Sequence, residues 1–179
     1  MIEITKISKL LGLKVSQLIF VVWPPFGEEN KNDIDISVAF KFFDGGAKYI
    51  SFYTDRDDNW TLVQQEIDIK KSISGSLFEK RINDWMEQNI DDVIDFEYFD
   101  LMDNSVFNEI VGRVIIGIEI LSMKGDIKPF GVKFLFENDF LILLPNTDGS
   151  TVETKSFNCR NNISRFVSLG EIVVTSIHL

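Results

Sequence analysis

One stretch of the chain, from Asp84 to Glu109, concentrates the side chains that could do chemistry. It carries nine carboxylates, whereas the nearest basic residues, Arg81 and Arg113, lie outside it. Paired carboxylates can act as acid and base in hydrolysis, and carboxylate oxygens can hold a hard cation. No spacing within the stretch singles out one such pair, so the sequence favours a solvated acidic surface over a catalytic centre. The nine residues are Asp84, Glu87, Asp91, Asp92, Asp95, Glu97, Asp100, Asp103 and Glu109.

The other residues with catalytic potential are isolated. His178 is the only histidine, and its place beside the last residue, where chains fray, makes a histidine-activated nucleophile unexpected. Cys159 is the only cysteine; Arg160 beside it would favour a reactive thiolate, although a bystander cysteine is the simpler interpretation. Two such ligands are too few for zinc, and the glycine motifs that bind phosphate are absent. We therefore predict a protein that is not an enzyme and needs no metal or cofactor.

A calcium-loop pattern begins at Asp55. Asp57 and Asn59 follow at alternate positions, and Glu66 stands eleven residues after Asp55, as the last ligand of an EF-hand does. Trp60, however, occupies the position that needs glycine, and the flanking segments have the pattern of strands rather than helices. Hairpin turns rich in Asp and Asn produce the same pattern, so the sequence leaves both interpretations open.

The composition is that of a folded, acidic chain. Its 179 residues are 45% hydrophobic and include 16 Phe, enough for the core of one domain. The longest apolar run, Leu18 to Trp23, is far shorter than the ~20 residues of a membrane-spanning helix, and the chain does not start with a secretion signal. We expect a cytoplasmic protein that does not enter membranes. A formal charge of −10 disfavours nucleic acid, whose phosphates would be repelled, and favours a cationic partner.

Alternating apolar residues predict an α+β fold built mostly from antiparallel strands. The Asp-Gly-Gly turn at 44–46 predicts a hairpin, and Ser76 with Glu79 forms a capping-box pattern that starts a central helix. Residues 94–101 have the pattern of an edge strand or an irregular connector. The expected strands are 14–23, 34–43, 48–53, 61–69, 114–121, 131–137, 140–144, 151–157 and 171–177, and the expected helices are 5–11, 76–89 and 104–111. For residues 61–69 a helix is the alternative.

The two halves of the chain resemble each other. Each starts with a short helical segment that ends in glycine, at Gly12 and at Gly112, and each contains a Val-x-Phe-x-Phe strand, at Val38 and at Val132. Any two β-meanders share such features once gaps are allowed, so a single domain over 1–179 is compatible with or without internal repeats. If repeats are present, they are 1–75 and 99–179, joined by a helix at 76–90 and an acidic connector.

A family resemblance rests on the repeated glycine patterns, Gly12-Leu-Lys-Val and Gly112-Arg-Val-Ile, which are followed by the Val-x-Phe-x-Phe strands and acidic turns. In these features the chain resembles the small acidic immunity proteins of bacterial toxin systems, including contact-dependent growth inhibition. The resemblance implies that the protein binds a cognate basic toxin domain, expected to be a nuclease, and blocks it by occlusion; it carries over no functional residues. Two other hypotheses are a structural protein that oligomerises through sheet edges and an enzyme that uses carboxylates or a metal.

For a partner-binding protein, the acidic stretch is the predicted contact surface. Its carboxylates would sit on a fixed scaffold, because the apolar residues between them, Trp85, Ile90, Ile94 and Phe96, are expected to be buried. Aromatic side chains at strand ends and in loops are the second candidate, since Trp side chains anchor many interfaces. The predicted partner-binding residues are Asp84, Glu87, Asp91, Asp92, Asp95, Glu97, Asp100, Asp103, Trp23 and Phe26.

Overall fold

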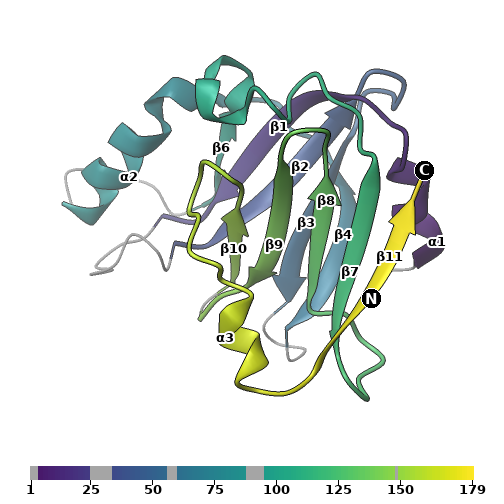
Figure 1. Ribbon diagram of the computed structural model, residues 1–179. Helices are drawn as coiled ribbons and strands as arrows, with labels where there is room; N and C mark the ends of the chain where they lie inside the picture. Colours follow the sequence, from purple (N-terminus) through teal and green to yellow (C-terminus); the bar gives the residue numbers. More distant parts are fainter. Residues whose placement is uncertain (1–3, 25–33, 56–59, 88–94, 148) are drawn as a thin grey trace.

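The protein is described by a computed structural model over residues 4–24, 34–55, 60–87, 95–147 and 149–179. Two β-sheets pack face to face in it, and short helices lie at their ends and outer faces (Figure 1). Among the described strands every pairing but one is antiparallel. The predicted α+β fold with mostly antiparallel sheet is therefore confirmed.

The first sheet has the strand order β4-β3-β2-β1-β6-β5. Its strands are β1 (Val15–Val22), β2 (Ile36–Phe42), β3 (Tyr49–Asp55), β4 (Thr61–Ile67), β5 (Ile73–Ser74) and β6 (Glu97–Asp100). The helical segments that belong to this half are α1 (Ile4–Ile7), η1 (Ser8–Leu10), η3 (Gly75–Leu77) and α2 (Phe78–Met86).

The second sheet has the order β10-β9-β8-β7-β11. Its strands are β7 (Gly117–Met123), β8 (Gly131–Leu135), β9 (Phe140–Pro145), β10 (Ser150–Glu153) and β11 (Ile172–His178). The helical segments are the 3-10 turns η4 (Leu101–Asp103) and η5 (Ser105–Phe107), where an α-helix over 104–111 was predicted, and α3 (Ser164–Val167).

The two sheets share one topology. In each, four consecutive strands form a meander, and a later strand pairs antiparallel with the free side of the meander's first strand: β6 with β1, and β11 with β7. Because β5 then pairs with β6, the segment predicted as an edge strand or connector is an interior strand. The pseudo-repeats and their origin by duplication stay predictions. The first unit defined by this topology extends through β6, beyond the boundary at residue 75.

The core fills the space between the sheets, toward which alternate side chains of each strand point. Phe134 of β8 lies between Phe40 and Phe52 of the first sheet, with ring centroids 5.0 Å apart in both pairs. All three side chains are fully buried. The Val-x-Phe-x-Phe strands of the two halves, which contain Phe40 and Phe134, thus face each other across the core.

Helix α2 extends this core beside β6. Phe78 and Trp85 are buried as predicted, and their rings lie 5.3 and 6.1 Å from the ring of Phe99 in β6. The spacing places both residues on one face of the helix. The helical segment starts earlier than the predicted capping box, because the side chain of Ser74 accepts the hydrogen bond from the N–H of Ser76.

A symmetric main-chain contact joins the two halves ahead of their first strands. The N–H of Gly12 donates to the carbonyl of Ile115 at 2.9 Å, and the N–H of Gly112 donates to the carbonyl of Val15 at 2.9 Å. The two glycines have φ values of 83° and 79°, a conformation that residues with a Cβ rarely adopt. The glycines that end the helical segments therefore also hold the halves together; we call this contact the glycine joint.

The outer faces of the sheets are covered differently. Because β4 and β5 occupy opposite edges of the first sheet, residues 68–72 cross its outer face, and Ile69 packs against the cluster that contains Ile19. We call residues 68–72 the crossing segment. The second sheet is covered by α3, whose Phe166 stacks on Phe130 with a centroid distance of 4.7 Å. The crossing segment leaves part of the first outer face accessible.

Candidate functional site

The acidic stretch does not form a single surface. Its described carboxylates are distributed over α2, β6 and the turns that follow, and most of them bind other residues of the fold. Asp91, Asp92 and Phe26, all predicted to contact a partner, lie outside the described residues.

Two carboxylates pair with basic residues of α2. Lys80 and Asp84, one helical turn apart, form an ion pair at 2.7 Å. Arg81 binds both oxygens of Glu97, with its Nε 2.9 Å from Oε2, and this hydrogen bonding raises the pKa of the Arg81 guanidinium. Since the Glu97 side chain is only 15% exposed, this pair attaches α2 to β6 and leaves little of the carboxylate for a partner.

The next two carboxylates, Asp100 and Asp103, accept hydrogen bonds that position the chain at the end of β6. Asp100 accepts a hydrogen bond from Gln17 at 2.9 Å, and Gln17 in turn accepts one from the hydroxyl of Tyr49 at 2.8 Å. Burial and, secondarily, the charge of Asp100 raise the pKa of Tyr49. Asp103 accepts a hydrogen bond from the hydroxyl of Ser74. These contacts give both carboxylates roles in positioning the chain.

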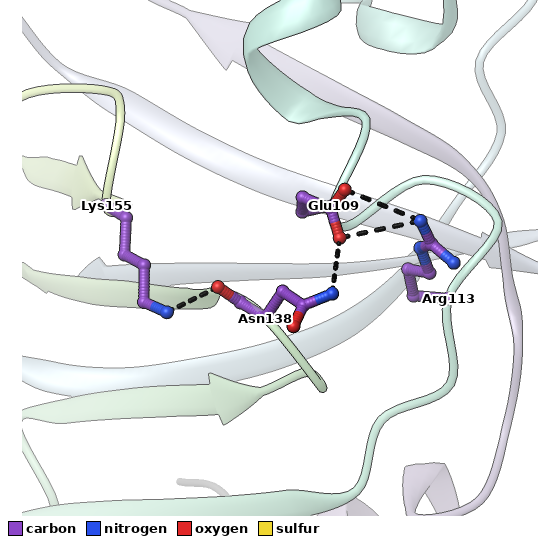
Figure 2. A network of polar contacts seen from close by, with 4 residues as sticks. All are labelled: Glu109, Arg113, Asn138 and Lys155. Carbon is purple, nitrogen blue, oxygen red and sulfur yellow. Dashed lines mark hydrogen bonds and ion pairs between the residues drawn. The ribbon is translucent and has the colours of Figure 1, made fainter.

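The last residue of the stretch, Glu109, belongs to a polar network within the second half. Figure 2 shows Glu109 between Arg113, 3.4 Å away in an ion pair, and Asn138, whose amide donates to it at 3.0 Å. The carbonyl of Asn138 accepts a hydrogen bond from the ammonium of Lys155. Glu109 therefore attaches the segment after η5 to the turn between β8 and β9.

Asp95, another carboxylate of the stretch, lies beside exposed aromatic side chains. It is exposed and accepts a hydrogen bond from the N–H of Phe96 at 2.8 Å. The Phe96 ring packs edge-on against Trp23, with centroids 5.0 Å apart. Phe96 was expected to be buried and is instead 41% exposed. It lies just before β6, beside Trp23, which follows the last residue of β1 and is 44% exposed. Glu87, at the end of α2, is also exposed but lies on a different element.

A groove of about 300 Å³ starts at Phe96 and runs across the outer face of the first sheet. Tyr53 and Tyr98 line it together with Ser37 and Ser51, whose small side chains leave the space between the tyrosines. The strand registers bring these residues together from β2, β3 and β6. Sequence reasoning missed this groove; the available signal was small polar residues at outward positions of otherwise bulky strands.

Carboxylates from other parts of the chain border the groove. Asp35 lines it, and one of its oxygens accepts a hydrogen bond from the N–H of Ser150 at 2.9 Å. Asp55 stands two residues beyond Tyr53 on the same face of β3, and burial followed by its charge raises the pKa of Tyr53. With Asp95 at the mouth, the groove combines aromatic walls with a negative border. We call Trp23, Asp95, Phe96 and the residues of this groove the aromatic–acidic groove.

Metal ligands do not gather in the described part of the chain: no three His, Cys, Asp or Glu side chains there lie close enough to hold an ion. Asp57 and Asn59 of the calcium-loop pattern lie outside the described residues. Glu66, which would be the last ligand, pairs with Lys48 at 3.3 Å, and the flanking segments are β3 and β4, as expected. Trp60 adopts a φ of 61°, the conformation for which an EF-hand uses glycine.

The remaining reactive residues are separate from one another. His178 lies on β11 and Cys159 is exposed in the loop after β10, so the fold does not bring a cysteine–histidine pair together. None of the described helices has the length and apolar character needed to cross a membrane. Comparisons of the chain with protein-family models, with curated proteins and with solved structures find no match.

Proposed function

We propose that this protein binds a basic partner protein through the aromatic–acidic groove and thereby neutralises it. The observation that carries the proposal is the exposed pair Trp23–Phe96 beside Asp95, at the mouth of a groove lined by tyrosines. Exposed aromatic side chains that pack on each other are preordered, so a partner that covers them gains contact area at little entropic cost.

The electrostatics support a cationic partner. Asp35 lines the groove, Asp55 lies beside Tyr53 of its lining, and Asp95 lies beside Phe96. The chain carries a formal charge of −10. A lysine or arginine of the partner would enter between the tyrosines, where its cation meets both aromatic faces and carboxylates. Attraction of this kind accelerates association and is screened by salt over a Debye length of ~8 Å at physiological ionic strength.

The resemblance to immunity proteins suggests the class of partner, a basic nuclease toxin. A nuclease binds phosphates with a cationic groove, and an acidic, aromatic surface would occupy that groove in place of nucleic acid. We infer that inhibition is by occlusion, with no catalysis by this chain, and that it takes place in the cytoplasm. The single cysteine agrees with a reducing compartment.

The test first looks for a large secreted protein with a variable C-terminal domain encoded immediately upstream, and then measures binding of that domain in a catalytically inactive form. Trp23→Ala combined with Phe96→Ala should raise the Kd by about a hundredfold, measured by calorimetry, because both anchors are lost. Phe43→Ala is the matched control, since Phe43 is an exposed aromatic residue at the opposite end of β2. An unchanged Kd in the double variant, with a folded protein, would refute this site.

The charge contribution is tested separately by association kinetics. Converting Asp55 and Asp95, which lie beside Tyr53 and Phe96 of the groove, to Asn should slow association severalfold at low salt. Glu97 is left unchanged because it pairs with Arg81. The control removes the same net charge from two exposed carboxylates elsewhere, Asp44 and Asp126. Equal effects of the two double variants would mean that net charge alone, rather than the groove, attracts the partner.

A further inference from the structure

Strand β11 forms an outer edge of the second sheet (Figure 1, yellow). The carbonyl of Glu171 accepts a hydrogen bond from Lys124 of the β7 side at 2.8 Å, and the N–H of Leu179 donates to Ile116 at 3.4 Å. Main-chain groups of alternate residues point to the same neighbour, so the odd-numbered residues of β11 face β7. The main-chain N–H and C=O groups of the even-numbered residues point away from β7, and no described residue binds them. These residues are Ile172, Val174, Ser176 and His178.

The other sheet edges carry the protections that natural proteins use. On β4 the N–H of Leu62 donates to Pro129 at 2.8 Å, and Glu66 with Lys48 places charges along the strand. Strand β5 has two residues, and all four residues of β10 are buried. By contrast, β11 pairs with β7 over seven residues in a continuous register and contains no Lys, Arg, Asp, Glu or Pro. An exposed, uncharged edge of this length is a template for another strand.

We propose that β11 pairs antiparallel with β11 of a second copy of this chain, so that two second sheets form one continuous sheet. The strand suits a copy of itself, because pairing places no like charges opposite each other. Val173 and Val174, which are 42% and 47% exposed, would be covered by the pairing. A partner selected by its positive charge would find no carboxylate on this strand, in contrast to the aromatic–acidic groove.

The strand is long enough for a symmetric register. With a two-fold axis at Thr175, Val174 lies opposite Ser176 of the partner subunit, and Ile172 lies opposite His178 of the partner subunit. Even-numbered residues then face even-numbered residues, so the unpaired main-chain groups of both strands are satisfied by about eight hydrogen bonds. The pairing of β11 with β7 is kept in this arrangement.

Salt separates this association from binding at the aromatic–acidic groove. Each copy carries −10, so two copies repel each other at long range, and salt screens that repulsion. The paired strands themselves are uncharged. Added salt should therefore strengthen self-association, whereas it should weaken binding of a basic partner.

The experiment is sedimentation analysis of the full chain over the micromolar concentration range, with amide hydrogen exchange on the same samples. We expect a species of twice the 20.6 kDa chain mass, and slow exchange of the even-numbered amides of β11. Val174→Lys places an ammonium on the edge and should give a monomer in which the Val174-side amides exchange quickly while those of Val173 and Thr175 stay protected by β7. Val167→Lys is the matched control, since Val167 is 64% exposed on α3, and it should remain a dimer.

The retained protection of the odd-numbered amides shows that the variant is folded, so loss of the dimer cannot be attributed to unfolding. A wild-type chain that is monomeric throughout this range would overturn the proposal. So would a dimer that persists in Val174→Lys. If the even-numbered amides become protected only when the basic toxin domain is added, the edge binds that partner instead of a second copy, and the proposal is wrong while the proposed function stands.

Discussion

Strands β6 and β11 hold the same place in their sheets, beside the first strand of a four-stranded meander, yet their surroundings differ. Phe99 in β6 is fully buried under α2, whereas Val173 and Val174 of β11 are almost half exposed. Strand β5 pairs with the other side of β6, and no described strand pairs with the other side of β11. One topology therefore ends in a closed edge in the first sheet and an open edge in the second.

The difference originates in the connections that precede these strands. The crossing segment carries the chain from β4 over the outer face to the far edge of the first sheet. There β5 pairs with β6, and α2 packs against Phe99 of β6. After β10 the chain instead folds back beside its own sheet. The buried carboxylate of Glu153 holds this loop by accepting hydrogen bonds from the main chain and the amide of Asn162, at 2.8 and 2.7 Å. The connection that precedes β6 or β11 therefore decides whether that strand is covered. The strand order, which the two sheets share, does not decide it.

Truncating the centre of each strand tests this comparison with the largest expected effect. Phe99→Ala should lower the free energy of unfolding by about 3–5 kcal/mol, because a buried aromatic ring is replaced by a cavity. Val173→Ala should lower it by about 0.5 kcal/mol, as substitutions at exposed positions do. Urea unfolding of both variants measures the difference. The measurement is made on dilute samples, because the proposed dimer would cover β11 at high protein concentration. Similar losses of free energy in the two variants would mean that β11 is covered in the monomer as well.

The ion pairs next to the two strands provide an intermediate effect. Glu97→Gln should cost about 1–2 kcal/mol, because Arg81 is left partly buried without its carboxylate. Glu171→Gln removes the partner of Lys124 just before β11, where both side chains are 65% exposed, and should cost about 0.5 kcal/mol or less. Double-mutant cycles with Arg81→Met and Lys124→Met would isolate the two pair energies. A larger coupling at the exposed pair would contradict the assignment of β6 as the anchored strand.

The smallest effect concerns the tyrosines of the first outer face. Burial, followed by the charges of Asp100 and Asp55, raises the pKa values of Tyr49 and Tyr53. The folded state therefore favours the neutral phenols. Their contribution is fully present below the unfolded pKa of about 10, and it is lost as the pH rises through the raised values. Unfolding free energies measured from neutral to alkaline pH should fall, and Tyr53→Phe should make the fall shallower. An unchanged pH profile in that variant would count against the raised pKa of Tyr53.

Much of the fold could be predicted from the sequence because strands alternate in hydrophobicity and the turns use Gly and Asp. Helix α3 has four residues, too few to show a helical period, and it was not predicted. The segment predicted as a helix at 104–111 contains 3-10 turns, whose apolar residues have the same spacing over such a short range. The place of β6 inside the sheet depends on β5, a two-residue strand without a sequence pattern.

The candidate site was harder to predict than the fold. The sequence identified Trp23 and Asp95, and the structure brings them to one place. The expected single acidic surface did not follow, because the stretch runs through a helix, a strand and turns. Most of its described carboxylates also bind other residues of the fold, such as Arg81 at Glu97 and Gln17 at Asp100. Tyr53 and Tyr98 line the same groove only through the registers of β3 with β2, β2 with β1 and β1 with β6, which no single segment of the sequence encodes.

The glycine joint has a consequence for how the molecule unfolds. Each glycine donates its N–H to a carbonyl of the opposite half, so melting one half would strip partners from main-chain groups of the other while also exposing their common core. A state with one sheet intact and the other melted is therefore unfavourable, although the two sheets are consecutive in the chain. Heat should consequently melt both sheets in one cooperative step, seen in calorimetry as a single peak whose van't Hoff enthalpy equals the calorimetric enthalpy.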